Sequence, residues 1–258
     1  MQITFLGTGT SQGVPVIGCS CAVCQSDDAH DNRLRTSVLI ETEDAKFTID
    51  AGPDFRQQML REKVTQLDAI LITHGHKDHV GGMDDIRSYN FLQKKAMIVW
   101  ADKLAANSIR TEFAYAFADD KYPGVPDFNL QLINGKPFNI GKTKIIPIPL
   151  MHLHMPVNGF RIGDFAYITD ANVIPKASWK LLHGVKILVI NALRKQKHIS
   201  HFNLEEALMV INKINPERAY LTHISHLMGL ESEISKELPE NVQFAWDGLQ
   251  IEYSANHE

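Results

Sequence analysis

The sequence predicts an α/β fold, and three observations favour that class. Short apolar runs rich in β-branched residues alternate with helical patterns along the whole chain. Several of the predicted strands run directly into histidine or aspartate. The chain has 258 residues, of which 44% are hydrophobic, so it can bury a substantial core. We predict one domain spanning residues 1–258.

The overall charge and the cysteine usage limit the classes of protein and partner. A formal net charge of -4 argues against a broad basic face, so nucleic acid is not an expected partner. No apolar run reaches the roughly 18 residues that a membrane span needs, and no charged segment precedes an apolar one as in a secretory signal. The three cysteines are too closely spaced for a disulfide framework, which favours a reducing cytoplasm.

The first predicted strand, residues 1–6, ends in a glycine-rich loop over residues 7–13. No helical pattern opens after this loop, so we interpret it as a tight turn rather than a phosphate-binding loop. A small cysteine-rich segment follows near residues 18–26, in which the C-x-C-x2-C spacing of Cys19, Cys21 and Cys24 lets three thiolates converge on one tetrahedral ion. A fourth ligand must come from elsewhere. Three buried, inert cysteines are the competing interpretation.

Two strands are predicted over residues 36–41 and 46–50, and a helix over residues 53–62. The second strand ends at Asp50, beside a glycine. Metal-bound imidazoles usually donate their other N–H to a carboxylate or a carbonyl, so Asp50 is a candidate partner for a nearby histidine. A local turn formed by its side chain is the alternative.

The segment from Thr73 to His79 follows a predicted buried strand over residues 68–72 and combines three imidazoles with a carboxylate. Its candidate metal ligands are His74, His76, Asp78 and His79. Imidazole nitrogens together with carboxylate oxygens suit zinc, manganese or iron. A solvated histidine-rich loop is the competing interpretation.

A helix leaves this loop near residues 83–89 and carries Arg87, about two helical turns after His79. Arg87 is therefore a candidate to hold an anionic group, and a salt bridge to Asp84 is the alternative. The middle of the chain predicts a strand from residue 96, an amphipathic helix over residues 104–117 and a loop over residues 123–126.

The second half supplies further candidate ligands. A strand over residues 144–150 leads to His152 and His154, which face the same way if the segment stays extended, although only one is needed. A strand over residues 164–170 ends in Asp170, a residue type that bridges two divalent ions; an N-cap for the next segment is the alternative.

The last third predicts a strand over residues 186–190, a helix over residues 203–215 and a strand over residues 219–226 that contains His223 and His226. His201 lies just before the helix and could donate a proton to a leaving group, since an ordinary histidine pKa is near 6.5. Arg194, in the same loop, joins His154 and Arg87 as a candidate substrate contact. The remaining histidines are interpreted as solvated or core residues: His30, His183, His198 and His257.

The order of the metal-type residues and the T-H-x-H-x-D-H motif resemble the metallo-β-lactamase superfamily over nearly the whole chain. The resemblance implies a four-layer αβ/βα sandwich with two divalent metal ions at one edge of its sheets. It implies that one ion is held by His74, His76 and His152, the other by Asp78, His79 and His223, and that Asp170 bridges them.

Within that superfamily, the Gly7-Thr8-Gly9 loop, the cysteine segment, Pro149-Leu150-x-His152 and Leu221-Thr222-His223-Ile224-Ser225-His226 resemble the cyclic phosphate phosphodiesterases of carbon–phosphorus lyase operons. This resemblance implies a structural zinc, a proton donor and a homodimer. The zinc ligands would be Cys19, Cys21, Cys24 and His226, and the proton donor would be His201.

The expected function is hydrolysis of a small, cyclic phosphodiester, with a hydroxide held between two zinc, manganese or iron ions as the nucleophile and with Asp78 and His201 as its catalytic residues. A tRNA 3′-processing endonuclease is the first alternative, against which stand the net charge and the lack of a basic, glycine-rich insertion. A thioester, lactone or β-lactam hydrolase is the next. A metal-dependent binding protein without turnover predicts broken ligand positions, and none is broken.

Overall fold

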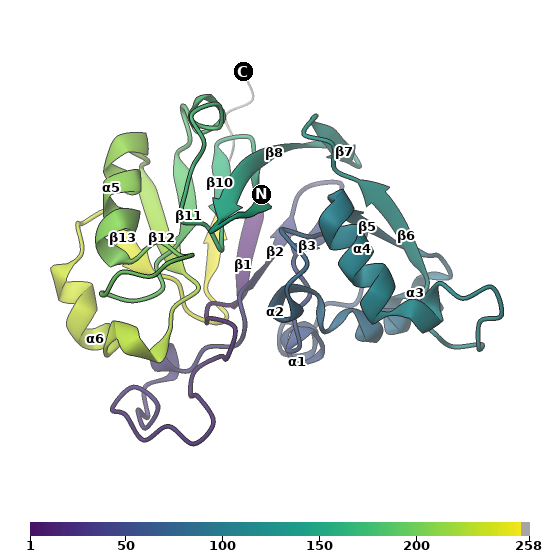
Figure 1. Ribbon diagram of the computed structural model, residues 1–258, viewed down its shortest axis with the longest axis horizontal. Helices are drawn as coiled ribbons and strands as arrows, with labels where there is room; N and C mark the ends of the chain where they lie inside the picture. The colour runs from purple at the N-terminus through teal and green to yellow at the C-terminus, as the bar shows by residue number, and fades with distance from the viewer. Residues whose placement is uncertain (254–258) are drawn as a thin grey trace.

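Two seven-stranded sheets face each other in the computed structural model, which describes residues 1–253 (Figure 1). His257 lies outside the described residues. The first sheet contains, in spatial order, β14 (Gln250–Glu252), β1 (Gln2–Gly7), β2 (Ser37–Glu41), β3 (Lys46–Ile49), β4 (Ala69–Leu71), β5 (Met97–Ala101) and β6 (Phe128–Leu132). The second contains β13 (Val242–Phe244), β12 (Arg218–Thr222), β11 (Ile187–Asn191), β10 (Phe165–Ile168), β9 (Met155–Ile162), β8 (Thr143–His152) and β7 (Phe138–Ile140).

Helices cover the outer face of each sheet. On the first sheet these are α1 (Phe55–Arg61), α2 (Lys77–Val80), α3 (Arg87–Gln93) and α4 (Lys103–Glu112), and on the second they are α5 (Leu204–Ile214) and α6 (Glu231–Ile234). Short 3-10 turns complete the described elements: Ala29–Asp31, Met83–Ile86, Ala114–Ala116, Trp179–Leu181, His226–Met228 and Ser235–Glu237. The predicted four-layer αβ/βα sandwich is therefore confirmed.

The central core lies between the two sheets. Phe5 and Phe47 of the first sheet are fully buried in one cluster with Phe160 and Tyr167 of the second. Because strand side chains alternate between faces, the opposite face of each sheet remains free to bury the apolar side of its helices.

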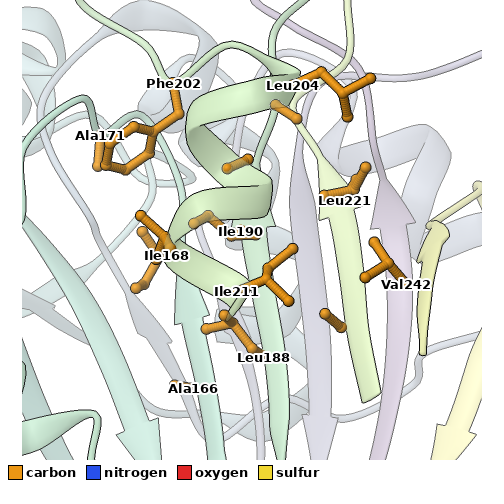
Figure 2. Close-up of a cluster of buried hydrophobic side chains, with 14 of the residues drawn as sticks. Ala166, Ile168, Ala171, Leu188, Ile190, Phe202, Leu204, Ile211, Leu221 and Val242 are labelled. Carbon is orange, nitrogen blue, oxygen red and sulfur yellow. The ribbon is translucent and has the colours of Figure 1, made fainter. Parts of the chain in front are cut away.

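Helix α5 shows how the outer layer is built (Figure 2). Asn203 caps its first turn in a capping box with Glu206, which satisfies backbone N–H groups that no earlier turn can bond. Its residues Ala207, Val210 and Ile211 are buried in one cluster with strands β10 to β13. This packing fixes the position of His201, two residues before the cap.

Strand direction brings the histidine-bearing loops to one edge. Strands β3 to β6 are parallel, and so are β10 to β13. The carboxyl ends of parallel strands emerge on the same side of a sheet, where α/β folds bind ligands. Among residues 1–253, no helix is both long enough and apolar enough to cross a bilayer.

Some local predictions differ from the structure. The extended segment ends at His152, because Leu153 turns the chain with a φ of 56°, so the expectation that His152 and His154 face the same way is wrong. The helix predicted over residues 104–117 stops at Glu112 and continues only as a 3-10 turn. Five strands were not predicted, and most of them are short or contain proline, glycine or exposed polar residues: β6, β7, β9, β13 and β14.

Candidate metal centre

The turn after β4 carries four of the predicted ligands into the edge of the first sheet. Thr73 and His74 are buried, and α2 begins at Lys77, so Asp78 and His79 lie on its single helical turn. The imidazole rings of His74 and His79 have centroids 4.1 Å apart, and His74 Nε2 lies 3.0 Å from His76 Nδ1. The T-H-x-H-x-D-H segment therefore folds on itself as a chelating turn.

Asp50 supports this turn from the end of β3. Its fully buried carboxylate accepts hydrogen bonds from the Thr73 amide at 2.9 Å and from the Thr73 hydroxyl, and His79 Nδ1 donates to it at 2.7 Å. The Thr73 hydroxyl in turn accepts from His74 Nδ1 at 3.0 Å. Both Nε2 atoms are thereby left for a metal, so of the two interpretations of Asp50 the structure supports the carboxylate partner of a histidine.

The second sheet adds the other ligands. His152 ends β8, and its Nδ1 donates to the Ser200 carbonyl at 2.8 Å. Asp170 follows β10, and His223 follows β12. His223 Nε2 lies 2.9 Å from Asp170 Oδ1, and His79 Nε2 lies 3.4 Å from Asp170 Oδ2.

Three groups of potential ligands share Asp170. The ligand atoms in each group lie within 4.8 Å of one another: Asp78, His79, Asp170 and His223; His74, His76 and Asp170; and His152, Asp170 and His201. Asp170 therefore stands between the His74 side and the His223 side of the cluster, and its role as a bridging ligand stays a prediction.

The chemistry of these donors fits divalent metal ions. Within residues 1–253, four ring nitrogens of this cluster are buried without a hydrogen bond: His79 Nε2, His201 Nδ1 and both nitrogens of His223. Buried polar atoms are rarely left unbonded, so these nitrogens indicate a missing partner. Burial alone would raise the pKa of Asp170, but the His223 and His79 imidazoles hold it well below its usual value, so the shared ligand is a carboxylate.

His201 lies beside the ligands from the second sheet. Its ring centroid is 4.6 Å from that of His152 and 4.8 Å from that of His223. Burial, followed by the charge of His223, lowers the pKa of His201 to about 3, so its imidazole is neutral near pH 7 in the metal-free chain.

The cysteine segment forms a separate cluster with the segment that follows β12. His226 Nδ1 lies 3.3 Å from the sulfur of Cys19, 3.4 Å from that of Cys21 and 3.6 Å from that of Cys24. A tetrahedral zinc with ordinary Zn–S and Zn–N bond lengths separates sulfur from nitrogen by about 3.5 Å. The knot, defined as these four residues, therefore has the spacing of a tetrahedral metal site, and His226 stands where the fourth ligand was expected.

The three predicted substrate contacts have other partners or are exposed. Arg87 pairs with Asp84 Oδ2 at 3.3 Å, the alternative weighed from the sequence. Arg194 donates to the carbonyls of Gln196 and Lys197 within its own loop. His154 is exposed in the turn after β8. Within residues 1–253, none of the three has a hydrogen bond or ion pair with the metal cluster, and their contact with substrate stays a prediction.

Two groups that support the ligands were not predicted from the sequence. Asn191, at the end of β11, accepts from the Ala171 amide at 2.9 Å and donates to the Ala171 carbonyl at 3.0 Å, and so fixes the backbone beside Asp170. The other is the Ser200 carbonyl that binds His152. An asparagine at a strand end was a visible signal for the first, whereas a backbone carbonyl leaves no signal in the sequence.

The fold is that of the metallo-β-lactamases, and these residue groups could hold metal ions. Residues 46–224 match the beta-lactamase superfamily domain, and the chain belongs to the metallo-β-lactamase superfamily, as a PhnP-like hydrolase. Its structure is similar to that of a diphosphatase from the PhnP family, with a TM-score of 0.92 and 37% identity over 98% of both chains.

Two other relatives extend the comparison. An octanoyltransferase of Porphyromonas gingivalis W83 is 40% identical over 97% of this chain and 51% of its own length, so the chain spans about half of that relative. The short form of human tRNase Z has a TM-score of 0.67 and 18% identity over 98% of this chain and 99% of its own, a likeness of fold alone.

Proposed function

We propose that the chain is a metal-dependent phosphodiesterase that hydrolyses a small, cyclic phosphodiester with two divalent ions, zinc, manganese or iron. One ion would be held by His74, His76 and His152, the other by Asp78, His79 and His223, with Asp170 between them. The observation that carries the proposal is Asp170, a buried carboxylate shared by ligand groups from both sheets. Similarity to a PhnP-family diphosphatase supports phosphate ester chemistry.

When bound, such ions lower the pKa of water and neutralise the charge on phosphoryl oxygens. The residues of the chain hold and orient the metal ligands. Asp50 and the Ser200 carbonyl hold His79 and His152 in the tautomers that leave Nε2 free. Asp78 adds a carboxylate beside His79 and His223, with Oδ2 3.2 Å from His79 Nε2 and 3.8 Å from His223 Nε2.

His201 would hold the proton that the departing alkoxide takes. A neutral imidazole with a pKa of about 3 is a poor donor, so this role needs a nearby negative charge. An anionic phosphate between His201 and the ligands would favour the charged imidazole and raise that pKa. The substrate would thereby create its own proton donor.

We also propose that the knot holds one structural zinc, that the protein acts as a cytoplasmic homodimer and that nucleic acid is not its substrate. The spacing of Cys19, Cys21, Cys24 and His226 supports the zinc. The net charge of -4 argues against an RNA substrate.

The name of the bacterial relative suggests acyl transfer as a second candidate. A thiolate nucleophile is a common means of acyl transfer. All three cysteines of this chain belong to the knot with His226, so none offers its thiolate at the metal cluster. If the chain acts on acyl groups, we expect hydrolysis of a thioester at the metal cluster, and a thioester is therefore included among the substrates of the assay.

The test is the initial rate of the zinc- or manganese-loaded protein on a ribose 1,2-cyclic phosphate, a precursor tRNA and an octanoyl thioester. We expect turnover of the cyclic phosphate, and its loss together with metal in Asp170→Asn. Preference for the tRNA or the thioester would replace the proposed substrate class. A metal-loaded protein that binds the cyclic phosphate without hydrolysing any of the three would support the binding-protein alternative.

A further inference from the structure

Three large apolar side chains are exposed on the loops that carry the metal cluster. Leu153 is 42% exposed, Val173 46% and Ile199 73%. Single exposed apolar residues are ordinary on protein surfaces, but here each lies within three residues of a member of the cluster. Leu153 follows His152, Val173 follows Asp170 at three residues, and Ile199 precedes His201 by two.

Hydrogen bonds join the three loops into one surface. The Asn172 side chain accepts from the Leu153 amide at 2.8 Å and donates to the Ile199 carbonyl at 2.9 Å. The backbones of Met151 and Val173 pair as an antiparallel bridge, with the Met151 amide 3.0 Å from the Val173 carbonyl. The backbone segments that carry Leu153, Val173 and Ile199 are thus joined to one another, and we call these three residues the apolar rim.

The rim continues directly into the metal cluster. His152 Nδ1 donates to the carbonyl of Ser200, the residue after Ile199, so the loop that bears Ile199 is bonded to a ligand. A group esterified to a phosphate bound at Asp170 would leave the cluster beside these loops. The three side chains offer it apolar contact and no charge.

We propose that the apolar rim is a specificity surface that favours phosphodiesters, cyclic or acyclic, whose esterified organic group carries an alkyl or acyl chain. This proposal rests on the proposed function, because the metals must hold the phosphate. An apolar group covers the rim and removes its surface from water, which favours binding in proportion to the area covered. Because Asn172 holds the loops of the rim in place, less conformational entropy is lost when the alkyl or acyl group binds.

The experiment compares two diesters with the same leaving group, hexyl p-nitrophenyl phosphate and methyl p-nitrophenyl phosphate. For the metal-loaded wild type we expect kcat/KM for the hexyl diester to exceed that for the methyl diester by about tenfold, the range that apolar pockets achieve. Ile199→Ser, Val173→Ser and Leu153→Asn should each move this ratio toward one. Asparagine is chosen at Leu153 because it tolerates the positive φ there.

A matched control is Ile17→Ser, which removes a fully exposed isoleucine that precedes the knot and should keep the wild-type ratio. Binding of hexyl phosphate and methyl phosphate, measured by titration calorimetry, provides a readout without turnover. We expect tighter binding of hexyl phosphate by the wild type and loss of that difference in Ile199→Ser.

The outcomes separate the two proposals. Turnover of both diesters with equal kcat/KM would overturn the rim and leave the phosphodiesterase in place. No turnover of these two diesters or of the ribose 1,2-cyclic phosphate, with hexyl phosphate still bound more tightly and dependent on Ile199, would support the rim and overturn the diesterase. If Ile199→Ser instead converts a dimer to a monomer and leaves the ratio unchanged, the rim is a contact between two copies of the chain and the specificity proposal is wrong.

Discussion

Asp50, Asp170 and His223 each turn the backbone into the left-handed region within two residues of the end of a strand, with φ values of 67°, 51° and 57°. This conformation costs a residue with a Cβ about 1 to 3 kcal/mol. Bonds from neighbouring strands hold it: Asp50 donates its amide to Leu71, and Asn191 bonds both backbone groups of Ala171. The positions of these residues are therefore set by their surroundings rather than by local preference.

Asp50 is expected to control both the tautomer of His79 and the affinity of the cluster for metal. The groups that face its carboxylate are donors: the Thr73 amide, the Thr73 hydroxyl and His79 Nδ1. In Asp50→Asn an amide NH2 would meet at least one of these donors, and the tautomer of His79 would no longer be fixed. We expect metal affinity, measured by competition with a chelator, to fall about 10- to 100-fold.

A matched control for Asp50→Asn is Asp54→Asn, which removes a carboxylate that pairs with Arg35 outside the cluster. It should keep the wild-type affinity. Unchanged affinity in Asp50→Asn would show that the carboxylate does not orient His79.

His201 allows a prediction about leaving groups. If it supplies the proton to the departing oxygen, His201→Ala should lower kcat about 10²- to 10⁴-fold on a diester with an alkoxide leaving group. The loss should be much smaller on a p-nitrophenyl diester, because p-nitrophenolate leaves without a proton. Metal content should be unchanged, and His183→Ala, which replaces an exposed histidine, should behave as the wild type. Equal losses on both diesters, or loss of metal, would contradict the proton-donor role.

At the scale of elements, close backbone approach positions the chelating turn. A Cβ built at Gly52 would lie 2.0 Å from the carbonyl oxygen of Asp78, so only glycine lets α2 pack against the end of β3. The amide of Ala51 donates to the His79 carbonyl at 2.8 Å across the same contact. The Asp50-Ala51-Gly52 segment thus both orients His79 and makes room for the turn that carries it.

The knot ties the cysteine segment to the end of β12. His226 follows the candidate ligand His223 by three residues, so the knot and the metal cluster share one short piece of chain. Structural zinc binding contributes directly to folding. We expect Cys21→Ser to lose one zinc, to lower the melting temperature and to yield poorly folded protein.

The control for Cys21→Ser is Ser20→Ala, a change at an exposed position inside the same segment that removes no ligand. It should keep the wild-type zinc content and melting temperature. A soluble, fully active Cys21→Ser protein with unchanged zinc would refute a structural role for the knot.

At the scale of the whole molecule, a buried polar network joins the two ends of the chain. Asp247 accepts from the Thr8 hydroxyl at 2.8 Å and from the Leu34 amide at 2.7 Å. Arg33 donates to the Thr8 hydroxyl at 2.9 Å and to Glu231 at 2.6 Å. Thr8 lies beside Ile224, whose amide donates to the Thr8 carbonyl at 2.9 Å. The network therefore braces the segment that carries His223.

Asp247 makes the stability of this network depend on pH. Burial raises the pKa of Asp247 to about 6 from a usual value of 3.8, so between about pH 4 and pH 6 the folded chain binds a proton that the unfolded chain releases. The free energy of unfolding should therefore fall as pH rises through this window. The total decrease in the free energy of unfolding is roughly 2 to 3 kcal/mol, and it is complete above about pH 6.

The measurement is urea unfolding of the wild type and Asp247→Asn at several pH values from about 4 to 7. All other titrating groups are common to both proteins, so the difference between their unfolding free energies isolates Asp247. We expect the free energy of unfolding of Asp247→Asn to increase relative to that of the wild type as pH rises from about 4 to 6. A difference that does not vary with pH would mean that burial does not shift this carboxyl group.

The sequence by itself determined the fold class and the residue types of the metal centre. The alternation of apolar strands and helical patterns is local, and so is the spacing of His74, His76, Asp78 and His79 on one turn. Each can be recognised within a short window, because side-chain periodicity and ligand spacing depend on near neighbours. For the same reason the C-x-C-x2-C spacing predicts a metal site by itself, although it does not identify the fourth ligand.

Only the tertiary structure decided which distant residues contact the metal ligands and the strand ends that carry them. The bond between Thr8 and Asp247 joins positions 239 residues apart, and the Ser200 carbonyl that orients His152 lies 48 residues from it. The left-handed φ of Leu153 removed His154 from the face of His152, and the same loops brought Leu153, Val173 and Ile199 together. Such contacts depend on how the two sheets pack, and side-chain packing over long sequence separations leaves no periodic signal in the chain.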